Sequence, residues 1–412
     1  MKRTPHPIFN KEYRRSLLFL AKWTFVAILS GCIGTAVVQG FNYLLTQIAI
    51  LTEQSFSFLP AWTIAGAAIC GLILYRFSPG SAGEGIPSYL NGLHKHKGIL
   101  NPKETAFKFL AALTTLGTYG NGGIVGPLGR VSAGIMSFFA VKFKRLRFND
   151  WDIRTATICG LAAAVGTIFH SSIGGGVFAV EIVQKSEMRY RDLFPAILSS
   201  STAVFICKAF GWQSFYPINA VPEFMSPNLL WILLLFSLLI GFAGKAFTAL
   251  YVFIARIFKR ERNERILLKV VAGSVLAGFG VWLLNPALMG TSKGFIAALF
   301  RPNTDILYGN LAHTVPLFVA LALMATAKAA GNCLTVGSGM SAGFTGPAAI
   351  IGMLLGAGWA DIFQLTPGSA NYSAIIAAGF AGMLGSTMNI PIAAAILTIE
   401  SFGLQYSFPA GI

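Results

Sequence analysis

Charge is scarce in this 412-residue sequence. Only 11% of its residues are Asp, Glu, Lys or Arg, against roughly 25% in soluble domains. Apolar residues make up 55% of the chain, the 45 glycines come in addition, and the mean hydropathy is +0.66. This composition excludes a soluble globule, a disordered tail and a nucleic-acid-binding module. The sequence predicts an all-α polytopic membrane protein.

Cysteine is also scarce, and the five cysteines stand singly in apolar runs. No pair has metal-ligand spacing, so neither a metal site nor a disulfide framework is indicated. No nucleotide-binding or nucleophilic-triad motif appears, so we predict no catalytic residues, no cofactor and no enzyme activity. Residues 29–32 (Leu-Ser-Gly-Cys) resemble a lipoprotein cleavage site, but the apolar run continues through them. A first membrane helix is therefore favoured over a cleaved signal.

Negative charge is the rarer sign, with 15 Asp and Glu against 31 Lys and Arg, which gives a net charge of +16. The basic residues gather in short connectors, at 2–15, 95–103, 142–154, 185–191 and 256–269. Such clusters mark cytoplasmic loops of membrane proteins; binding to a nucleic acid or to specific lipids is the alternative. Residues 1–15 are thus expected to form a basic cytoplasmic N-terminus. The apolar remainder of the chain is expected to lie in the lipid bilayer, which is then a partner of the protein.

The apolar stretches have irregular lengths. A perpendicular span needs about 20 residues, whereas 155–183 and 373–402 are longer and 105–120 is shorter. Many stretches are interrupted by glycine or proline, and broken backbone survives in a bilayer only where it is buried in protein or lines a watery cavity. This pattern favours a transporter or channel.

An internal repeat links the two halves of the chain. Residues 160–181 match 379–400, and Gly160, Ala162, Gly166, Ile173 and Glu181 recur identically 219 positions later. Duplicated halves with interrupted segments at matching positions indicate a transporter with a site near the midplane. We expect the halves to be 16–210 and 211–412. Chance likeness between small-residue membrane helices is the alternative.

Three glycine-proline clusters begin apolar segments. Proline is tolerated in the first helical turn, where its missing N–H would be unpaired anyway. Each cluster therefore predicts the N-terminus of a half-helix, which offers free N–H donors and about +0.5 of dipole charge to an anion. The predicted anion-binding residues are Gly83, Glu84, Gly85, Ile86 and Pro87, then Gly123, Ile124, Val125, Gly126 and Pro127, then Gly343, Phe344, Thr345, Gly346 and Pro347.

The three clusters, in this order and at these separations, resemble the anion-binding signatures of the CLC chloride channel and transporter family. The match runs from about residue 16 to the end and includes Lys108, ahead of the second cluster. The resemblance implies a homodimer with one pore in each subunit, in the inner membrane of a bacterium. Each subunit would be two inverted repeats of tilted and broken helices that hold chloride, or a similar small anion, between helix N-termini.

Two departures from the family pattern bear on mechanism. The family's outer gating glutamate corresponds to Val125, and the inner proton-transfer glutamate of its exchangers corresponds to Ile182. Neither side chain can titrate, so the resemblance to branches with valine at the outer gate favours passive anion conduction. No residue is assigned to the family's inner-gate tyrosine, because Tyr406 lies too early in the chain.

Glu84 is the third departure, at a position where the family commonly has serine. A carboxylate there would repel chloride by several kcal/mol at ~4 Å and an effective dielectric near 20. Apolar burial disfavours the charged carboxylate and a helix N-terminus favours it, so the sequence leaves its charge open. Glu84 is either a gate, alongside Val125, or a cap of its own helix, or the mark of a lost anion site.

Three functions therefore remain open: a passive anion channel, a proton-coupled anion exchanger that uses Glu84, and a transport-inactive membrane interaction protein.

Further expectations concern other polar residues. Glu181 and Glu400 are expected to pair with backbone or lysine, and His170 and Asn389 to be hydrogen-bonded core residues. Lys328 is expected either to add positive potential to the pathway or to extend its amine to the interface.

Overall fold

The computed structural model describes residues 7–55, 58–143, 148–183, 190–259 and 265–412. These residues form helices joined by short connectors, and their only β-type pairing is one isolated bridge. Eight of the described helical segments are long and apolar enough to cross a membrane, as predicted for an all-α polytopic protein. The longer helices are α1 (Pro7–Ser55), α2 (Leu59–Arg76), α3 (Ile86–Lys95), α4 (Pro102–Gly117), α5 (Val125–Lys142), α6 (Asp150–Phe169), α7 (Gly174–Glu181), α8 (Tyr190–Ala209), α9 (Leu230–Lys259), α10 (Ile266–Leu284), α13 (Leu317–Gly337), α14 (Thr345–Ile362), α15 (Ala370–Met388) and α16 (Pro391–Phe402).

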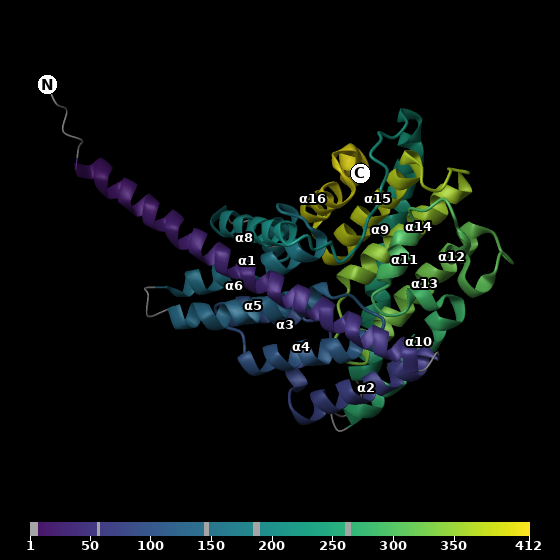
Figure 1. Cartoon of the computed structure of the whole chain (residues 1–412), viewed down its shortest axis with the longest axis horizontal. Coiled ribbons are helices and arrows are strands. Elements are labelled where there is room, and N and C mark those ends of the chain that lie inside the picture. The colour runs from purple at the N-terminus through teal and green to yellow at the C-terminus, as the bar shows by residue number, and fades with distance from the viewer. Residues whose placement is uncertain (1–6, 56–57, 144–147, 184–189, 260–264) are drawn as a thin grey trace.

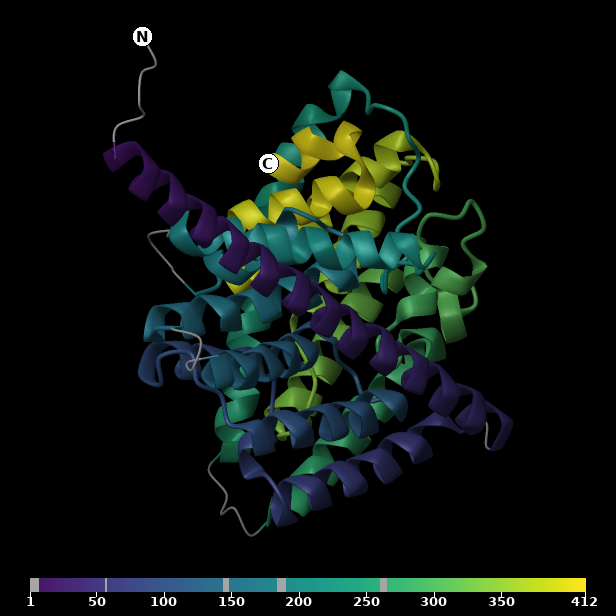
Figure 2. The same cartoon turned by 60° about the vertical axis from the view of Figure 1, so that its left-hand side comes forward.

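The first helix is the longest of the described part. α1 crosses the molecule diagonally and extends beyond it at its N-terminal end (Figures 1 and 2). It packs against α6 and α8 along its length. The helix already begins at Pro7, so the described part of the predicted basic N-terminus is continuous with the first span.

The order of helices repeats. α2 to α7 are followed, in the same order, by α10, α11 (Lys293–Ala298), α13, α14, α15 and α16. Equivalent helices start 207 residues apart at α3 and α11, and 220 residues apart at α5 and α14. The second half has the additional short helix α12 (Asp305–Tyr308) between α11 and α13, which lies where the spacing changes. The fold is the predicted pair of inverted repeats, here built of tilted helices of unequal length.

Two over-long apolar stretches are each divided by one residue in the left-handed backbone region. His170 (φ 53°) ends α6, and Asn389 (φ 58°) ends α15. Their backbone N–H groups bond back to the carbonyl oxygens of Gly166 and Gly385, as in a left-handed helix C-cap. The expectation of two hydrogen-bonded core side chains was wrong, because Asn389 is exposed and His170 Nε2 has no partner among the described residues. The two residues occupy equivalent places in the repeat because each ends a helix in the left-handed backbone region.

The two glutamates at equivalent repeat positions cap each other's helices. Glu181, at the end of α7, accepts hydrogen bonds from the N–H groups of Ile392 (3.1 Å) and Ala393 (2.6 Å) at the start of α16. Glu400, in α16, accepts from the N–H of Gly174 (2.9 Å) at the start of α7. Carboxylates stabilise helix N-termini. The expected structural pairing with backbone is therefore confirmed for both.

Two buried lysines hold the segments that lead into α3 and α11. Lys328 donates to the carbonyl oxygens of Leu288 (2.8 Å) and Gly290 (2.8 Å) and to Asn121 Oδ1 (3.0 Å). Lys108, which is 220 positions earlier, donates to the carbonyl oxygens of Ser81 (3.1 Å) and Gly83. Each lysine thus fixes the same turn in its own half of the molecule. Lys328 is fully buried, so its amine does not extend to the interface.

Replacing Lys328 with methionine should destabilise the protein. The change keeps the apolar stem but removes one of two donors from the Leu288 and Gly290 carbonyl groups and leaves Asn121 Oδ1 without its lysine donor. An unpaired buried polar group costs about 1–3 kcal/mol. Thermal unfolding of the detergent-solubilised protein measures the effect, with Lys245→Met as the control because Lys245 is exposed on α9. Equal unfolding midpoints for the two variants would show that the Lys328 contacts add nothing to stability.

Candidate anion pathway

Each predicted cluster lies at the start of a helix. α3 begins at Ile86, α5 at Val125 and α14 at Thr345. The ten residues of α3 make it about 15 Å long, or half of a bilayer core, as predicted for a half-helix. The expectation of half-helices was wrong for α5 and α14, because each has 18 residues and is about 27 Å long. What the three share is an N-terminus buried inside the protein.

The N-termini of α5 and α14 meet at a pair of glycines. Gly123 N donates to the carbonyl oxygen of Gly343 (2.9 Å), and Gly343 N donates back to that of Gly123 (2.7 Å). The approach requires glycine, since a Cβ at Gly123 would lie 2.8 Å from the backbone N of Gly346. The segments 124–125 and 344–345 therefore lie within a side chain's reach of one another, as the predicted anion site requires.

We call the place where the N-termini of α5 and α14 meet the crossing. α3 contacts it through Gly85. That residue has φ 110°, and a Cβ on it would lie 2.7 Å from the carbonyl oxygen of Gly126. Gly126 in turn packs against the Glu84 carboxyl group. The structure thus brings the three clusters together at one place, where three sets of helix-end N–H groups and partial positive charges converge.

Glu84 both caps its helix and faces the crossing. Its Oε2 accepts a hydrogen bond from the N–H of Ile86 at 2.8 Å. Its Oε1 is buried without a hydrogen-bond partner among the described residues and lies against Gly126, and the backbone N–H of Phe344 is near the same carboxyl group. The side chain is only 6% exposed. Capping and a position in the pathway, which the sequence left as alternatives, therefore coexist.

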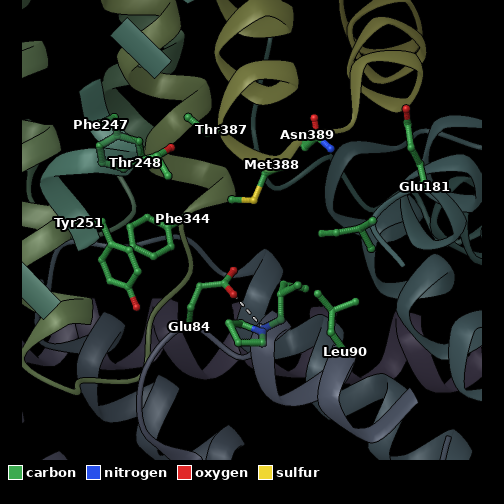
Figure 3. Close-up of a pocket in the computed structure, with 13 residues that line it drawn as sticks. Glu84, Leu90, Glu181, Phe247, Thr248, Tyr251, Phe344, Thr387, Met388 and Asn389 are labelled. Carbon is green, nitrogen blue, oxygen red and sulfur yellow. Dashed lines mark hydrogen bonds between the residues drawn. The ribbon is translucent and has the colours of Figure 1, made fainter. Parts of the chain in front are cut away.

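A cavity of about 230 Å³ opens beside Glu84. Figure 3 shows Glu84 next to Phe344, with Glu181 on the far side of the cavity. Both oxygens of Glu181 accept hydrogen bonds from α16. Of the two carboxyl groups that line the cavity, Glu84 is therefore the one with an oxygen that has no hydrogen-bond partner among the described residues. The cavity reaches the exposed Asn389, and its lining residues are Glu84, Ile86, Pro87, Leu90, Glu181, Ile182, Phe247, Thr248, Tyr251, Phe344, Thr387, Met388 and Asn389.

The remaining predicted residues lie behind this cavity. Val125 and Ile124 are fully buried and are not among its lining residues. The Thr345 side chain is also buried, and its Oγ1 has no hydrogen-bond partner in the described part of the chain. Ile182, by contrast, lines the cavity and gives it an apolar patch of wall.

Sequence reasoning missed the contributions of the connector between α8 and α9 and of α9 itself. Tyr216 lies in that connector and reaches Gly346, and Phe247 and Tyr251 line the cavity from one face of α9. The four-residue spacing of Phe247 and Tyr251 is the sequence signal that would have placed them on one helix face. Tyr216 belongs to no motif, so only the structure reveals it.

A polytopic helical fold in which helix N-termini meet inside the protein is typical of membrane transport proteins that handle anions. The sequence profile of the voltage-gated chloride channel family matches residues 66–412, and the chain belongs to this family. It is 26% identical over 416 residues to the H⁺/Cl⁻ exchange transporter ClcA of Vibrio campbellii, a match that covers 95% of this chain and 83% of that protein. ClcA of Klebsiella pneumoniae is 23% identical over 395 residues, which cover 91% and 79%.

Solved structures share the fold. A CLC-type fluoride/proton antiporter matches with a TM-score of 0.79 at 20% identity, over 95% of this chain and 93% of that one. A slow cyanobacterial Cl⁻/H⁺ antiporter matches with a TM-score of 0.75 at 18% identity, over 95% and 93%. A eukaryotic CLC transporter matches with a TM-score of 0.75 at 15% identity, over 96% and 71%. These similarities support the predicted arrangement of two inverted repeats.

Proposed function

We propose that the protein conducts chloride or a similar small anion passively, along a pathway that the Glu84 carboxylate closes. The observation that carries the proposal is Glu84 Oε1, which has no hydrogen-bond partner in the described part of the chain and lies against Gly126 where the helix N-termini meet. A carboxylate in this place acts as a tethered anion, because it takes up the positive potential that would attract a free one. Protonation or withdrawal of Glu84 would open the path.

Two apolar replacements support passive transport. Val125 begins α5 and Ile182 lines the cavity, and neither side chain can accept a proton. The other carboxyl group beside the cavity, Glu181, is engaged by two backbone N–H groups. A proton that reaches Glu84 therefore has no second free carboxyl group ahead of it among the residues that line this cavity.

Proton-coupled exchange is the second candidate. It is favoured by the same unpartnered oxygen, because Glu84 faces a cavity that reaches the surface and can take up a proton there. The names of the curated relatives also describe H⁺/Cl⁻ exchange. In this version Glu84 replaces the missing gating glutamate and carries protons in exchange for anions.

We further infer a homodimer in the inner membrane of a bacterium, with the N-terminus in the cytoplasm. The bacterial relatives support the location. The basic connectors support the orientation, since Lys and Arg are retained on the cytoplasmic side. Family membership supports the dimer with one pathway in each subunit.

Flux through purified protein in proteoliposomes separates the functions. A chloride gradient is imposed, and chloride efflux and internal pH are followed together. We expect chloride movement without stoichiometric proton movement. Uphill proton movement in fixed ratio to chloride would replace the passive proposal with exchange. Protein that moves neither ion would indicate a transport-inactive membrane interaction protein.

A further inference from the structure

The Tyr216 hydroxyl is a buried polar group that lies far along the chain from the three clusters. The residue is 3% exposed, and its Oη has no hydrogen-bond partner among the described residues. The hydroxyl lies over Gly346 in the first turn of α14, where a Cβ would overlap it. It is also near the backbone N–H of Ile124, just before α5. The group thus points at both helix N-termini of the crossing.

The position of Tyr216 is fixed by its neighbours. The backbone N–H of Phe215 donates to the carbonyl oxygen of Ile168 near the end of α6 (3.0 Å), and Ser214 Oγ donates to the same oxygen (3.0 Å). The Tyr216 ring packs against Phe169, with ring centroids 5.4 Å apart. A buried hydroxyl normally finds a hydrogen-bond partner. Here it is held without one, among the described residues, beside free helix-end donors.

Two groups that lack a hydrogen-bond partner among the described residues pack on glycines at matching positions of the repeat. Glu84 packs on Gly126, and Tyr216 packs on Gly346, the residue 220 positions later in the equivalent turn of α14. The two halves are inverted, so equivalent surfaces of α5 and α14 face opposite sides of the membrane. Tyr216 accordingly does not line the cavity beside Glu84.

Positive charge lies near Tyr216 on this side. The Lys293 amine stands 5.1 Å from the centre of the Phe215 ring, in the residue next to Tyr216. Lys293 begins α11 and is partly exposed. A cation at this point attracts anions from the surface toward the buried hydroxyl.

We propose that the Tyr216 hydroxyl donates a hydrogen bond to a monovalent anion at the N-termini of α5 and α14, on the side of the crossing opposite Glu84. The inference rests on the proposed function and adds an anion-coordinating side chain that lies outside the three clusters. A hydroxyl is suited to this task, because it binds an anion as a neutral donor and can turn away to release it.

The test compares Tyr216→Phe with Tyr372→Phe. Phenylalanine keeps the ring and removes only the hydroxyl. Tyr372 is the matched control, since it is fully buried and its Oη also lacks a hydrogen-bond partner among the described residues, but it lies near Asp361 at the opposite end of α14. Chloride binding is measured by titration calorimetry in detergent, and chloride flux in proteoliposomes. We expect chloride affinity to fall about 10- to 100-fold in Tyr216→Phe, the loss for one hydrogen bond to a charged partner, and to stay within about twofold in Tyr372→Phe.

The outcomes separate this inference from the proposed function. If Tyr216→Phe binds chloride as the wild type does, the inference is overturned, while wild-type flux still supports passive conduction. If Tyr216→Phe loses affinity but the wild-type protein couples chloride to protons, the inference stands and the passive proposal falls. Wild-type protein that neither binds nor moves chloride would overturn both. An equal loss in Tyr372→Phe would assign the effect to general disturbance and also overturn the inference.

Discussion

Replacing Glu84 with serine is expected to raise anion flux at neutral pH at least about tenfold and to flatten its dependence on pH. The carboxylate opposes an anion at ~4 Å by about 4 kcal/mol at an effective dielectric near 20, and serine offers a donor without charge. Wild-type flux should rise as the pH falls, because protonation removes the charge of Glu84 and turns the acid into a donor. The measurement is chloride flux against pH for both proteins side by side.

Two further variants sharpen this comparison. Glu84→Gln removes the charge but keeps the bulk, so it should act in the same direction and less fully. Glu223→Ser is the control, because Glu223 is an exposed acid in the connector before α9. If Glu84 served only to cap α3 through Ile86 N, Glu84→Ser would leave the pH dependence unchanged and lose at most ~1 kcal/mol of stability. Parallel flux curves for wild type and Glu84→Ser would end the gate proposal.

The fold could be predicted to the level of its repeat. Apolar composition determined the class, and the recurrence of Gly160 to Glu181 at 379–400 indicated two equivalent halves. The ends of the helices were harder to predict. His170 and Asn389 break two apolar stretches through a left-handed backbone, and neither residue type has to adopt that conformation. Their shared place in the repeat was visible, whereas its physical cause was not.

The candidate site divides in the same way. Proline within the first turn and glycine before it predicted a helix start at each of the three clusters, and the helices begin there, at Ile86, Val125 and Thr345. Composition carried no information on which groups from distant segments complete the site. The Gly123–Gly343 pairing, the position of Tyr216 over Gly346 and the α9 wall are tertiary contacts. The Lys108 and Lys328 amines likewise find carbonyl groups that no sequence spacing reveals.

Introducing glutamate at Val125 is expected to block anion flux at neutral pH and to make it return as the pH falls. Val125 is the first residue of α5 and is fully buried beside the start of α14. A carboxylate there would compete with anions for the helix-end N–H groups and their positive potential. Protonation weakens that competition, because the neutral acid has no charge to hold at the helix ends. We expect flux at about pH 7 to fall tenfold or more, since a helix-end carboxylate held by several charge-assisted hydrogen bonds gains at least ~1.5 kcal/mol.

Val125→Gln is the matched control for this block. Glutamine has nearly the size of glutamate and cannot titrate, so steric obstruction alone would lower flux equally in both variants and at every pH. Flux is compared from about pH 4 to about pH 8, a range that spans the ordinary glutamate pKa of about 4.3. Combining Val125→Glu with Glu84→Ser should leave one pH-dependent step, that of the new carboxylate, because serine removes the carboxyl group that lies against Gly126, the residue after Val125. A pH dependence of flux in Val125→Glu that equals that of Val125→Gln and of the wild type would remove Val125 from the pathway and leave Glu84 as the acidic gate.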